Sequence, residues 1–225
     1  TLDLHGFYKP TGLNRTSPNI INFEAVFGME EMKWSSIQKD MMEYDVTMPY
    51  IRMMAGPVDY TPGAMRNASK KDFKDIYYNP MSQGTRCHQL AAYVVHDSPL
   101  TMLADNPTIY KREQECTDFI ISIPNKGIEE TRVLQGKVGE SIIMARRAGT
   151  SWYIGGMTDW TAREITLDFD FLDNGNYEVI LFKDGINADK QAEDYKQEQF
   201  TITPASKKKI RMASGGGFAM TITKK

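Results

Sequence analysis

Three glutamates stand close together near the start of the sequence. Glu24, Glu30 and Glu31 fall within eight residues, with Gly28 and Trp34 beside them. Crowded carboxylates can ligate a hard cation such as calcium, which takes oxygen ligands. Two carboxyl groups can also act on a substrate as acid and base, or as acid and nucleophile. Charge spacing alone favours a solvated acidic turn, so the residues by themselves leave these interpretations open.

Other polar residues follow apolar segments in the same half of the chain. His5 ends the alternating residues 2–5 and Lys9 follows them, and Asp59 comes after the apolar run 50–55. Reactive groups of a parallel α/β barrel lie at the carboxyl ends of its strands, so we expect these side chains to lie near the glutamates. Taken alone, His5 is typical of a structural histidine, and residues 59–63 form a good turn sequence.

The elements that must position these residues alternate between strands and helices. We predict strands at 2–5, 19–23, 50–55 and 99–103, and helices at 82–96, with Ser82 as the N-cap, and at 108–121. Such alternation indicates parallel βα units. Met53 and Met54 are expected in the core of the sheet.

A parallel sheet of this kind is buried on both faces or closes as an eight-stranded barrel. We therefore predict that residues 1–125 are the C-terminal half of a (β/α)8 catalytic barrel whose other half lies upstream. Since the first residue is Thr1 and not Met, we expect the chain to have been processed or trimmed. Half a barrel leaves apolar edges open, so we predict that the chain alone aggregates or unfolds.

After residue 125 the pattern becomes all-β. Ile165, Leu167 and Phe169 alternate with polar residues, which is typical of a half-buried strand. Further strands are predicted at 141–147, 152–154, 177–181, 199–202 and 218–222. Residues 126–225 are therefore predicted to form a small antiparallel β-sandwich, and the fold class of the whole chain is α/β followed by β.

Composition excludes several classes of partner. The net charge is −2, so no long-range field recruits nucleic acid or anionic lipid. No apolar run reaches the roughly 20 residues that a membrane helix needs, so we expect no membrane insertion. Cys87 and Cys116 are the only cysteines, and we predict two buried free thiols in preference to a disulfide.

Several segments of the sequence closely resemble glycoside hydrolase family 97. They occur in order along nearly the whole chain: His5-Gly6, Lys9-Pro10-Thr11-Gly12, Asn22-Phe23-Glu24-Ala25-Val26 with Gly28 and Glu30 before Trp34, residues 51–63, Gln83-Gly84-Thr85-Arg86, Ser98-Pro99-Leu100 and residues 184–188. The resemblance implies an exo-acting, calcium-dependent α-glycosidase with an N-terminal β-sandwich, a central barrel and a C-terminal β domain. This chain then supplies the end of that plan.

The resemblance also implies roles for individual residues. Glu30 matches the general acid, and Glu24 matches a calcium ligand, with Glu30 as a second ligand of the Ca2+. His5, Lys9 and Asp59 are expected to contact the oligosaccharide substrate, and salt bridges between loops are the alternative for Lys9 and Asp59. Independently of the resemblance, the aromatic side chains of Trp34 and Tyr60 are expected to offer apolar faces for sugar stacking.

Position 6 distinguishes the two mechanisms of the family. Inverting members carry a glutamate directly after the histidine, and this chain has Gly6, as expected for the retaining branch. The resemblance then favours an α-galactosidase whose nucleophile lies upstream, so the chain alone is expected to be inactive without the missing N-terminal portion. It also implies a periplasmic or secreted protein. The alternatives are an inverting α-glucosidase and a non-catalytic carbohydrate-binding protein that holds sugar through Trp152 and Trp160.

Overall fold

The computed structural model describes residues 1–34 and 39–225. The first part of the chain contains the helices and four short strands: β1 (Leu2–Leu4), α1 (Leu13–Thr16), β2 (Ile20–Phe23), η1 (Met29–Lys33), α2 (Met41–Ile51), η2 (Arg52–Ala55), β3 (Asn67–Ala68), β4 (Ser82–Gln83), α3 (Arg86–Val95), α4 (Pro107–Arg112) and α5 (Gln114–Ser122). β1 pairs with β2 and β3 pairs with β4, both in parallel. Among the described residues, no helix is long and apolar enough to cross a membrane.

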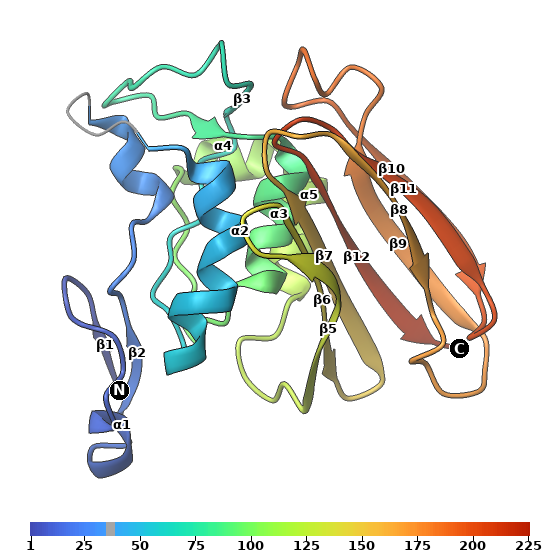
Figure 1. Cartoon of the computed structure of the whole chain (residues 1–225), viewed down its shortest axis with the longest axis horizontal. Helices are drawn as coiled ribbons and strands as arrows, with labels where there is room; N and C mark the ends of the chain where they lie inside the picture. The colour runs from blue at the N-terminus through green and yellow to red at the C-terminus, as the bar shows by residue number, and fades with distance from the viewer. Residues whose placement is uncertain (35–38) are drawn as a thin grey trace.

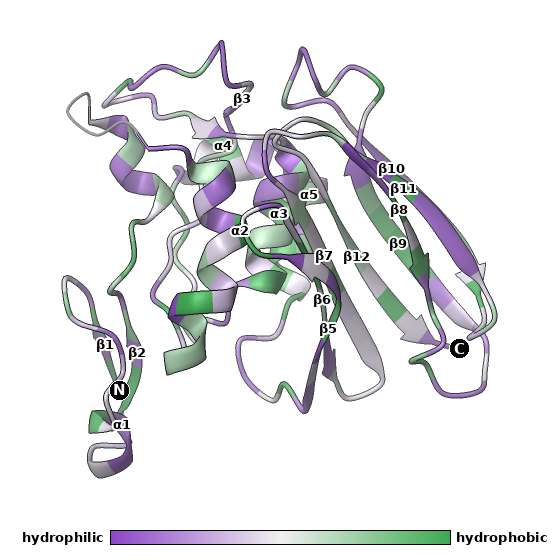
Figure 2. Ribbon diagram, in the orientation of Figure 1, coloured by the Kyte–Doolittle hydropathy of each residue, from purple (hydrophilic) through white to green (hydrophobic). Residues whose placement is uncertain are grey.

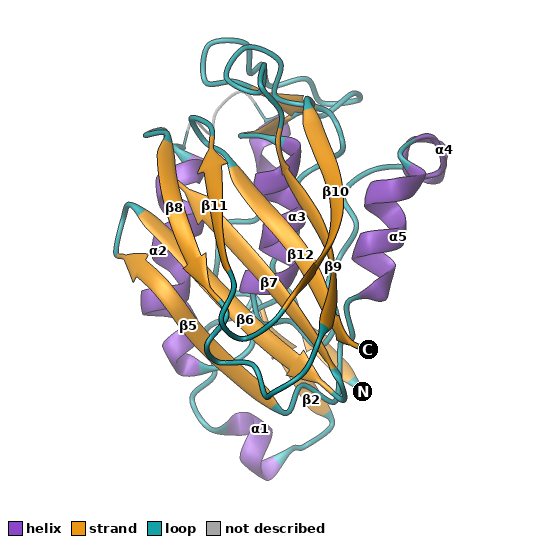
Figure 3. Ribbon diagram, turned by 90° about the vertical axis from the view of Figure 1, so that its right-hand side faces the viewer, coloured by secondary structure: helices purple, strands orange, loops and turns teal. Residues whose placement is uncertain are grey.

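The rest of the chain is antiparallel β-structure, as predicted. Its strands are β5 (Glu130–Lys137), β6 (Ser141–Ala148), β7 (Ser151–Thr158), β8 (Arg163–Asp168), β9 (Tyr177–Asp184), β10 (Tyr195–Ile202), β11 (Lys207–Met212) and β12 (Gly217–Lys224). Six of them form one sheet in the order β10-β9-β12-β7-β6-β5, and β8 pairs with β11. Figure 3 shows β8 and β11 in front of the six-stranded sheet and the helices behind it.

The six-stranded sheet is covered on both faces. Leu167 of β8 and Ile210 of β11 pack with Ile154 and Phe218 in one apolar core. On the other face, α3 contacts β6, β7, β9 and β12 (Figure 1). Figure 2 shows hydrophobic colouring recurring along α3 and β9. The alternation of apolar residues in the strands thus reflects burial between these layers.

Glycines allow α3 to approach the sheet closely. A Cβ atom at Gly155 would lie 2.7 Å from the carbonyl oxygen of Ala91, and one at Gly217 would lie 3.0 Å from Cα of His88. Side chains at these two positions would therefore push helix and sheet apart. The contact depends on backbone meeting backbone.

The helix α3 begins three residues later than predicted. Thr85, not Ser82, is the N-cap, and its hydroxyl oxygen accepts a hydrogen bond from the backbone N–H of His88 (3.1 Å). Ser82 is instead paired with Asn67 in the β3–β4 ladder. The Thr85 hydroxyl also donates to buried Asp184 (2.6 Å), which joins the start of α3 to the end of β9.

The helix α2 replaces a predicted strand. The apolar run 50–55 forms the end of α2 and the 3-10 helix η2. Asp40 caps the N-terminus of α2, and the helix continues through Pro49 into this run. Pro49 has no N–H for the carbonyl oxygen of Asp45, four residues earlier. Nε2 of His96 lies 3.3 Å from that oxygen and replaces the missing N–H as its hydrogen-bond partner. Met54, expected in the core, is 81% exposed.

Other expectations for the first half are also corrected. Residues 99–103 form no strand, and the predicted helix 108–121 is divided at Glu113, whose carboxylate binds buried Arg86 (2.9 Å). Cys87 and Cys116 are buried and free, as predicted. The described residues contain two short parallel pairs in place of a continuous parallel sheet, so the half barrel stays a prediction.

Candidate functional site

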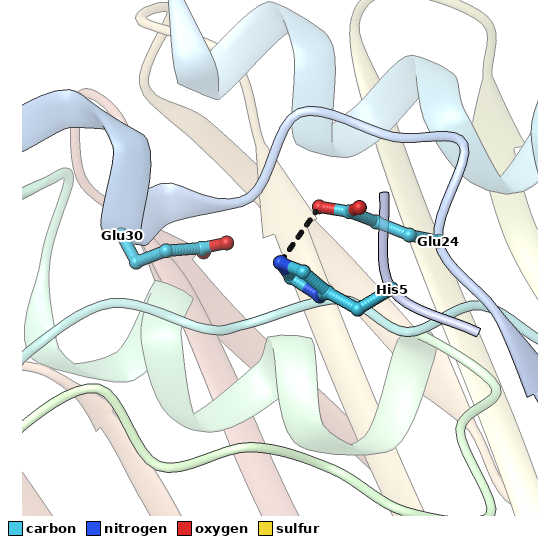
Figure 4. A group of neighbouring side chains, drawn as sticks. All are labelled: His5, Glu24 and Glu30. Atoms are coloured by element: carbon cyan, nitrogen blue, oxygen red, sulfur yellow. Dashed lines mark ion pairs between the residues drawn. The ribbon is translucent and has the colours of Figure 1, made fainter. Parts of the chain in front are cut away.

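His5, Glu24 and Glu30 lie together in the structure (Figure 4). One nitrogen or carboxylate oxygen from each lies within 4.8 Å of the others. His5 follows β1 and Glu24 follows β2, and the two strands run parallel, so their carboxyl ends meet at one edge. Glu30 is supplied by η1. Residues that are 25 positions apart in the sequence thus converge on one point, as the sequence predicted for strand ends.

His5 is held between two carboxylates. Its Nδ1 lies 2.8 Å from Oδ2 of Asp59, and its Nε2 lies 3.6 Å from Oε1 of Glu24. The hydrogen bond to Asp59 raises the pKa of His5, since it favours the protonated ring. Asp59 is only 2% exposed and is held in place by its surroundings, so its hydrogen bond fixes the orientation of the His5 imidazole. The structure gives Asp59 a partner within the protein.

Glu24 is fixed by the backbone of the first loop. The N–H of Gly6 donates to Oε2 of Glu24, and Gly6 has a φ of 65°, in the region that favours glycine. Glu24 is buried, and the N–H group compensates part of the cost of burying its charge. Position 6 therefore contributes a backbone donor to this site.

Glu30 is partly buried, and burial raises the pKa of its carboxyl group. In the described part of the chain, its Oε2 is buried without a hydrogen-bond partner. Gly28 makes room for this carboxylate, because a Cβ atom at position 28 would lie 2.0 Å from Oε2 of Glu30. Glu31 does not belong to the cluster found among the described residues.

The segment 59–61 supports the site from the core side. The N–H of Asp59 donates to the carbonyl oxygen of Phe23 (2.9 Å), and the carbonyl oxygen of Thr61 accepts from the N–H of Met29 (3.0 Å). Tyr60 points the other way, and its hydroxyl donates to buried Asp45 (2.6 Å). The segment is thereby tied to β2, η1 and α2 at once.

Asp45 is part of a polar group that the sequence analysis missed. Nε2 of His88 lies 3.1 Å from its second carboxylate oxygen, and all three side chains, of Asp45, Tyr60 and His88, are almost fully buried. The sequence does contain a sign of this group, because Asp45 and His88 stand among apolar residues in the helical segments 41–51 and 86–95. Since buried charges are usually paired, such residues are candidates for a buried polar contact.

Several expected sugar contacts are placed elsewhere. Tyr60 is 1% exposed and cannot stack on a ligand, whereas Trp34 is 39% exposed beside Tyr77. Lys9 is exposed and makes no side-chain hydrogen bond among the described residues. Trp152 is buried against Phe171, which overturns its proposed role as a sugar platform.

The residues of the cluster fit a divalent ion in part. The two carboxylates, of Glu24 and Glu30, are ligands that calcium prefers, and the unpartnered Oε2 of Glu30 is a free acceptor within the described residues. The imidazole of His5 is not a typical calcium ligand. The two glutamates therefore supply an incomplete oxygen set, which further ligands would have to complete.

Sequence comparison finds a family match and two curated relatives. Residues 127–223 match the family described as "Glycosyl-hydrolase 97 C-terminal, oligomerisation". The chain is 56% identical over 221 residues to a retaining alpha-galactosidase of Bacteroides thetaiotaomicron, covering 98% of this chain and 33% of the relative. It is 27% identical over 184 residues to a probable retaining alpha-galactosidase of Streptomyces bingchenggensis, covering 82% of this chain and 26% of the relative.

The fold matches solved structures of the same family. A glycoside hydrolase family 97 enzyme of Pseudoalteromonas sp. strain K8, in complex with panose, superposes with a TM-score of 0.84 at 32% identity, over 96% of this chain and 34% of that one. The chain thus spans about a third of the length of the Bacteroides relative and of the Pseudoalteromonas enzyme. This chain belongs to glycoside hydrolase family 97.

Proposed function

We propose that the chain is the C-terminal part of an exo-acting retaining α-galactosidase, referred to below as the parent protein. The observation that carries this proposal is the convergence of Glu30, Glu24 and His5 at the carboxyl ends of β1 and β2. The 56% identity to a relative named as a retaining alpha-galactosidase supports the substrate class. Residues 1–125 would then complete a (β/α)8 barrel with the upstream part of the parent protein.

In the proposed mechanism, Glu30 is the general acid. An enclosed carboxyl group stays protonated more readily, and the proton on Glu30 would pass to the departing glycosidic oxygen. The nucleophile would be a carboxylate in the upstream part of the parent protein. Glu30 would then take a proton from water, and the sugar would be released with its configuration retained.

Gly6 supports retention over inversion. An inverting enzyme needs a base that activates water on the far face of the sugar, and glycine has no side chain for that task. In the structure, position 6 contributes only its N–H, which binds Glu24. We therefore favour the retaining α-galactosidase over the inverting α-glucosidase.

Glu24 would hold calcium through its ionised carboxylate, and Glu30 would join it only through the oxygen that carries no proton, since the general acid must keep its proton. When bound, the ion would supply positive charge that fixes the position of Glu24 and stabilises ionised groups around it. His5 would remain oriented by Asp59, with Nε2 facing the cluster, where it can bind a sugar hydroxyl group. The protein is further proposed to act outside the cytoplasm, in the periplasm or after secretion.

The role of Glu30 is tested by Glu30→Gln in the parent protein, with Glu31→Gln as the matched control. We expect Glu30→Gln to lower kcat on an α-galactosyl disaccharide by roughly 100- to 10,000-fold, the usual contribution of a general acid. The loss should be much smaller on an aryl α-galactoside, whose leaving group needs little protonation. Unchanged turnover of the disaccharide would remove Glu30 from this role, and an equal loss in Glu31→Gln would reassign it.

A further inference from the structure

A cavity lies beside η1, the helix that carries Glu30. Its volume is about 410 Å³, which is within the usual range of about 300–1,000 Å³ for ligand pockets. Met32 of η1 forms one side, two residues after Glu30. Trp160 and Phe73 provide aromatic surface, and Lys39, Lys70 and Lys74 with Asp40 and Asp75 provide charged groups.

Trp160 reaches this cavity from the β half of the chain. It lies in the turn after β7, where the Ser214 hydroxyl donates to its carbonyl oxygen (2.7 Å). The ring packs so closely on Gly215 that a Cβ atom there would lie 2.5 Å from it. Its Nε1 is buried and has no acceptor among the described residues. Leaving a buried donor unpaired lowers the stability of the fold, so stability alone does not account for the position of this ring.

The polar groups around Trp160 include both donors and acceptors. Nζ of Lys70 lies 5.7 Å from the centre of the indole ring and 3.2 Å from Asp40. Lys74 and Asp75 are exposed and form no ion pair within the described part of the chain. Gln83 anchors one wall, because its side chain binds the N–H of Met41 and the carbonyl oxygen of Lys39.

This combination matches the chemistry of an uncharged sugar. The C–H face of a pyranose packs on an aromatic ring, and its hydroxyl groups accept hydrogen bonds from ammonium groups and donate them to carboxylates. A phosphate would be attracted by the three lysines but repelled by Asp40 and Asp75. The mixed charge therefore favours a neutral polyhydroxylated ligand over an anion.

We propose that this cavity binds the leaving-group side of an oligosaccharide, with Trp160 as the stacking platform and Lys74 and Asp75 as hydroxyl contacts. The inference rests on the proposed function, since it assigns a place to the part of the substrate beyond the terminal sugar. It gives residues 126–225 a part in substrate selection, because Trp160 belongs to that half of the chain.

The test compares a long and a short substrate in the parent protein. Lys74→Ala and Trp160→Ala are expected to raise KM for an α-galactosyl trisaccharide about tenfold, on the scale of one or two lost contacts, with kcat retained. The values for an aryl α-galactoside should not change. Lys209→Ala, which removes an exposed lysine of β11, is the matched control. Trp160→Phe, which keeps an aromatic face, should recover part of the loss.

The outcomes separate this inference from the proposed function. If both variants affect the two substrates equally, or neither substrate, the sugar site is wrong while the α-galactosidase assignment stands. If the unaltered protein cleaves neither substrate, the proposed function fails. Direct titration with the trisaccharide then shows whether the cavity binds sugar, and an unchanged Kd in Lys74→Ala overturns the site. Binding of inorganic phosphate without binding of the trisaccharide also overturns it.

Discussion

At the scale of single residues, the site depends on positions that have no reactive group. Gly6 holds Glu24 through its N–H, and Gly28 leaves space for the carboxylate of Glu30. In the sequence, Gly28 is visible only as a neighbour of the glutamates, and Gly6 only as part of a family pattern. Their physical roles follow from the structure, since neither a hydrogen bond to a distant side chain nor a missing Cβ atom is visible in residue spacing.

Gly28→Ala should therefore disable the site without unfolding the protein. The new methyl group would occupy the place of Oε2 of Glu30, and the flexible glutamate would turn away while the backbone stays. A displacement of about 1 Å can cost on the order of a hundredfold in rate, so we expect kcat of the parent protein on an α-galactosyl disaccharide to fall by about that factor.

The control for this prediction is the double variant Gly28→Ala/Glu30→Gln. It should be no slower than Glu30→Gln alone, because the glycine acts only through Glu30. Thermal unfolding should occur at nearly the same temperature as in the unaltered protein. Multiplicative losses in the double variant would show that Gly28 has another role.

Much of the site could be predicted from the sequence. The convergence of His5, Glu24 and Glu30 was expected from their positions after successive parallel strands, and the structure brings these three together. The partners of Tyr60 and Asp59 could not be predicted, since both are set by packing. An aromatic residue in a turn sequence was expected at the surface, whereas Tyr60 binds Asp45 in the core.

At the scale of elements, α2 shows why sequence patterns failed in the first half. Met41, Met42, Val46 and Met48 are buried on several sides of the helix, so no single apolar stripe marks it. A short apolar run such as 50–55 is compatible with a strand or with a buried helix. In the β half, β8 and β9 were predictable because apolar and polar residues alternate along them, whereas β5 and β11, in which few residues are buried, were not predicted.

Pro49 makes α2 depend on His96, and this gives a pH dependence. Burial lowers the pKa of His96 to about 4, below the usual value near 6.5 in an unfolded chain. The folded state thus binds fewer protons between these values, so this stabilisation is present above pH 6.5 and is lost as the pH falls toward 4. The difference corresponds to roughly 3 kcal/mol.

His96→Gln isolates this contribution in the parent protein. Glutamine keeps a donor for the carbonyl oxygen of Asp45 and does not titrate. The unfolding temperature of the unaltered protein should fall relative to that of the variant as the pH is lowered from 6.5 to 4. Asp184, whose pKa burial raises to about 6, acts in the opposite direction but equally in both proteins. Parallel curves for the two proteins would exclude His96 as the cause.

At the scale of the whole molecule, the two ends of the chain differ in how well they are covered. The β half has a core on each face of its main sheet. In the first half, Leu2, Ile51, Leu100 and Leu103 are exposed. Only three residue pairs join β1 and β2, which is too few for a stable sheet on its own.

We therefore still expect residues 1–225 alone to aggregate or to unfold in part. Exposed apolar side chains and short parallel strands favour association with other chains. Size-exclusion chromatography with light scattering should show large species, or hydrogen exchange should show early opening of residues 1–34. A monodisperse sample that unfolds in one cooperative transition would contradict this expectation.

The close contact of α3 with Gly155 and Gly217 has a consequence for protein engineering. Because helix and sheet meet backbone to backbone, the β half cannot be treated as a module that is transferable by cutting at residue 126. In a chimera that joined this sheet to the helix of a distant relative, a bulkier helix surface would clash with the strands, and a smaller one would leave a void. A successful exchange of domains would have to carry α3 along with the strands it covers.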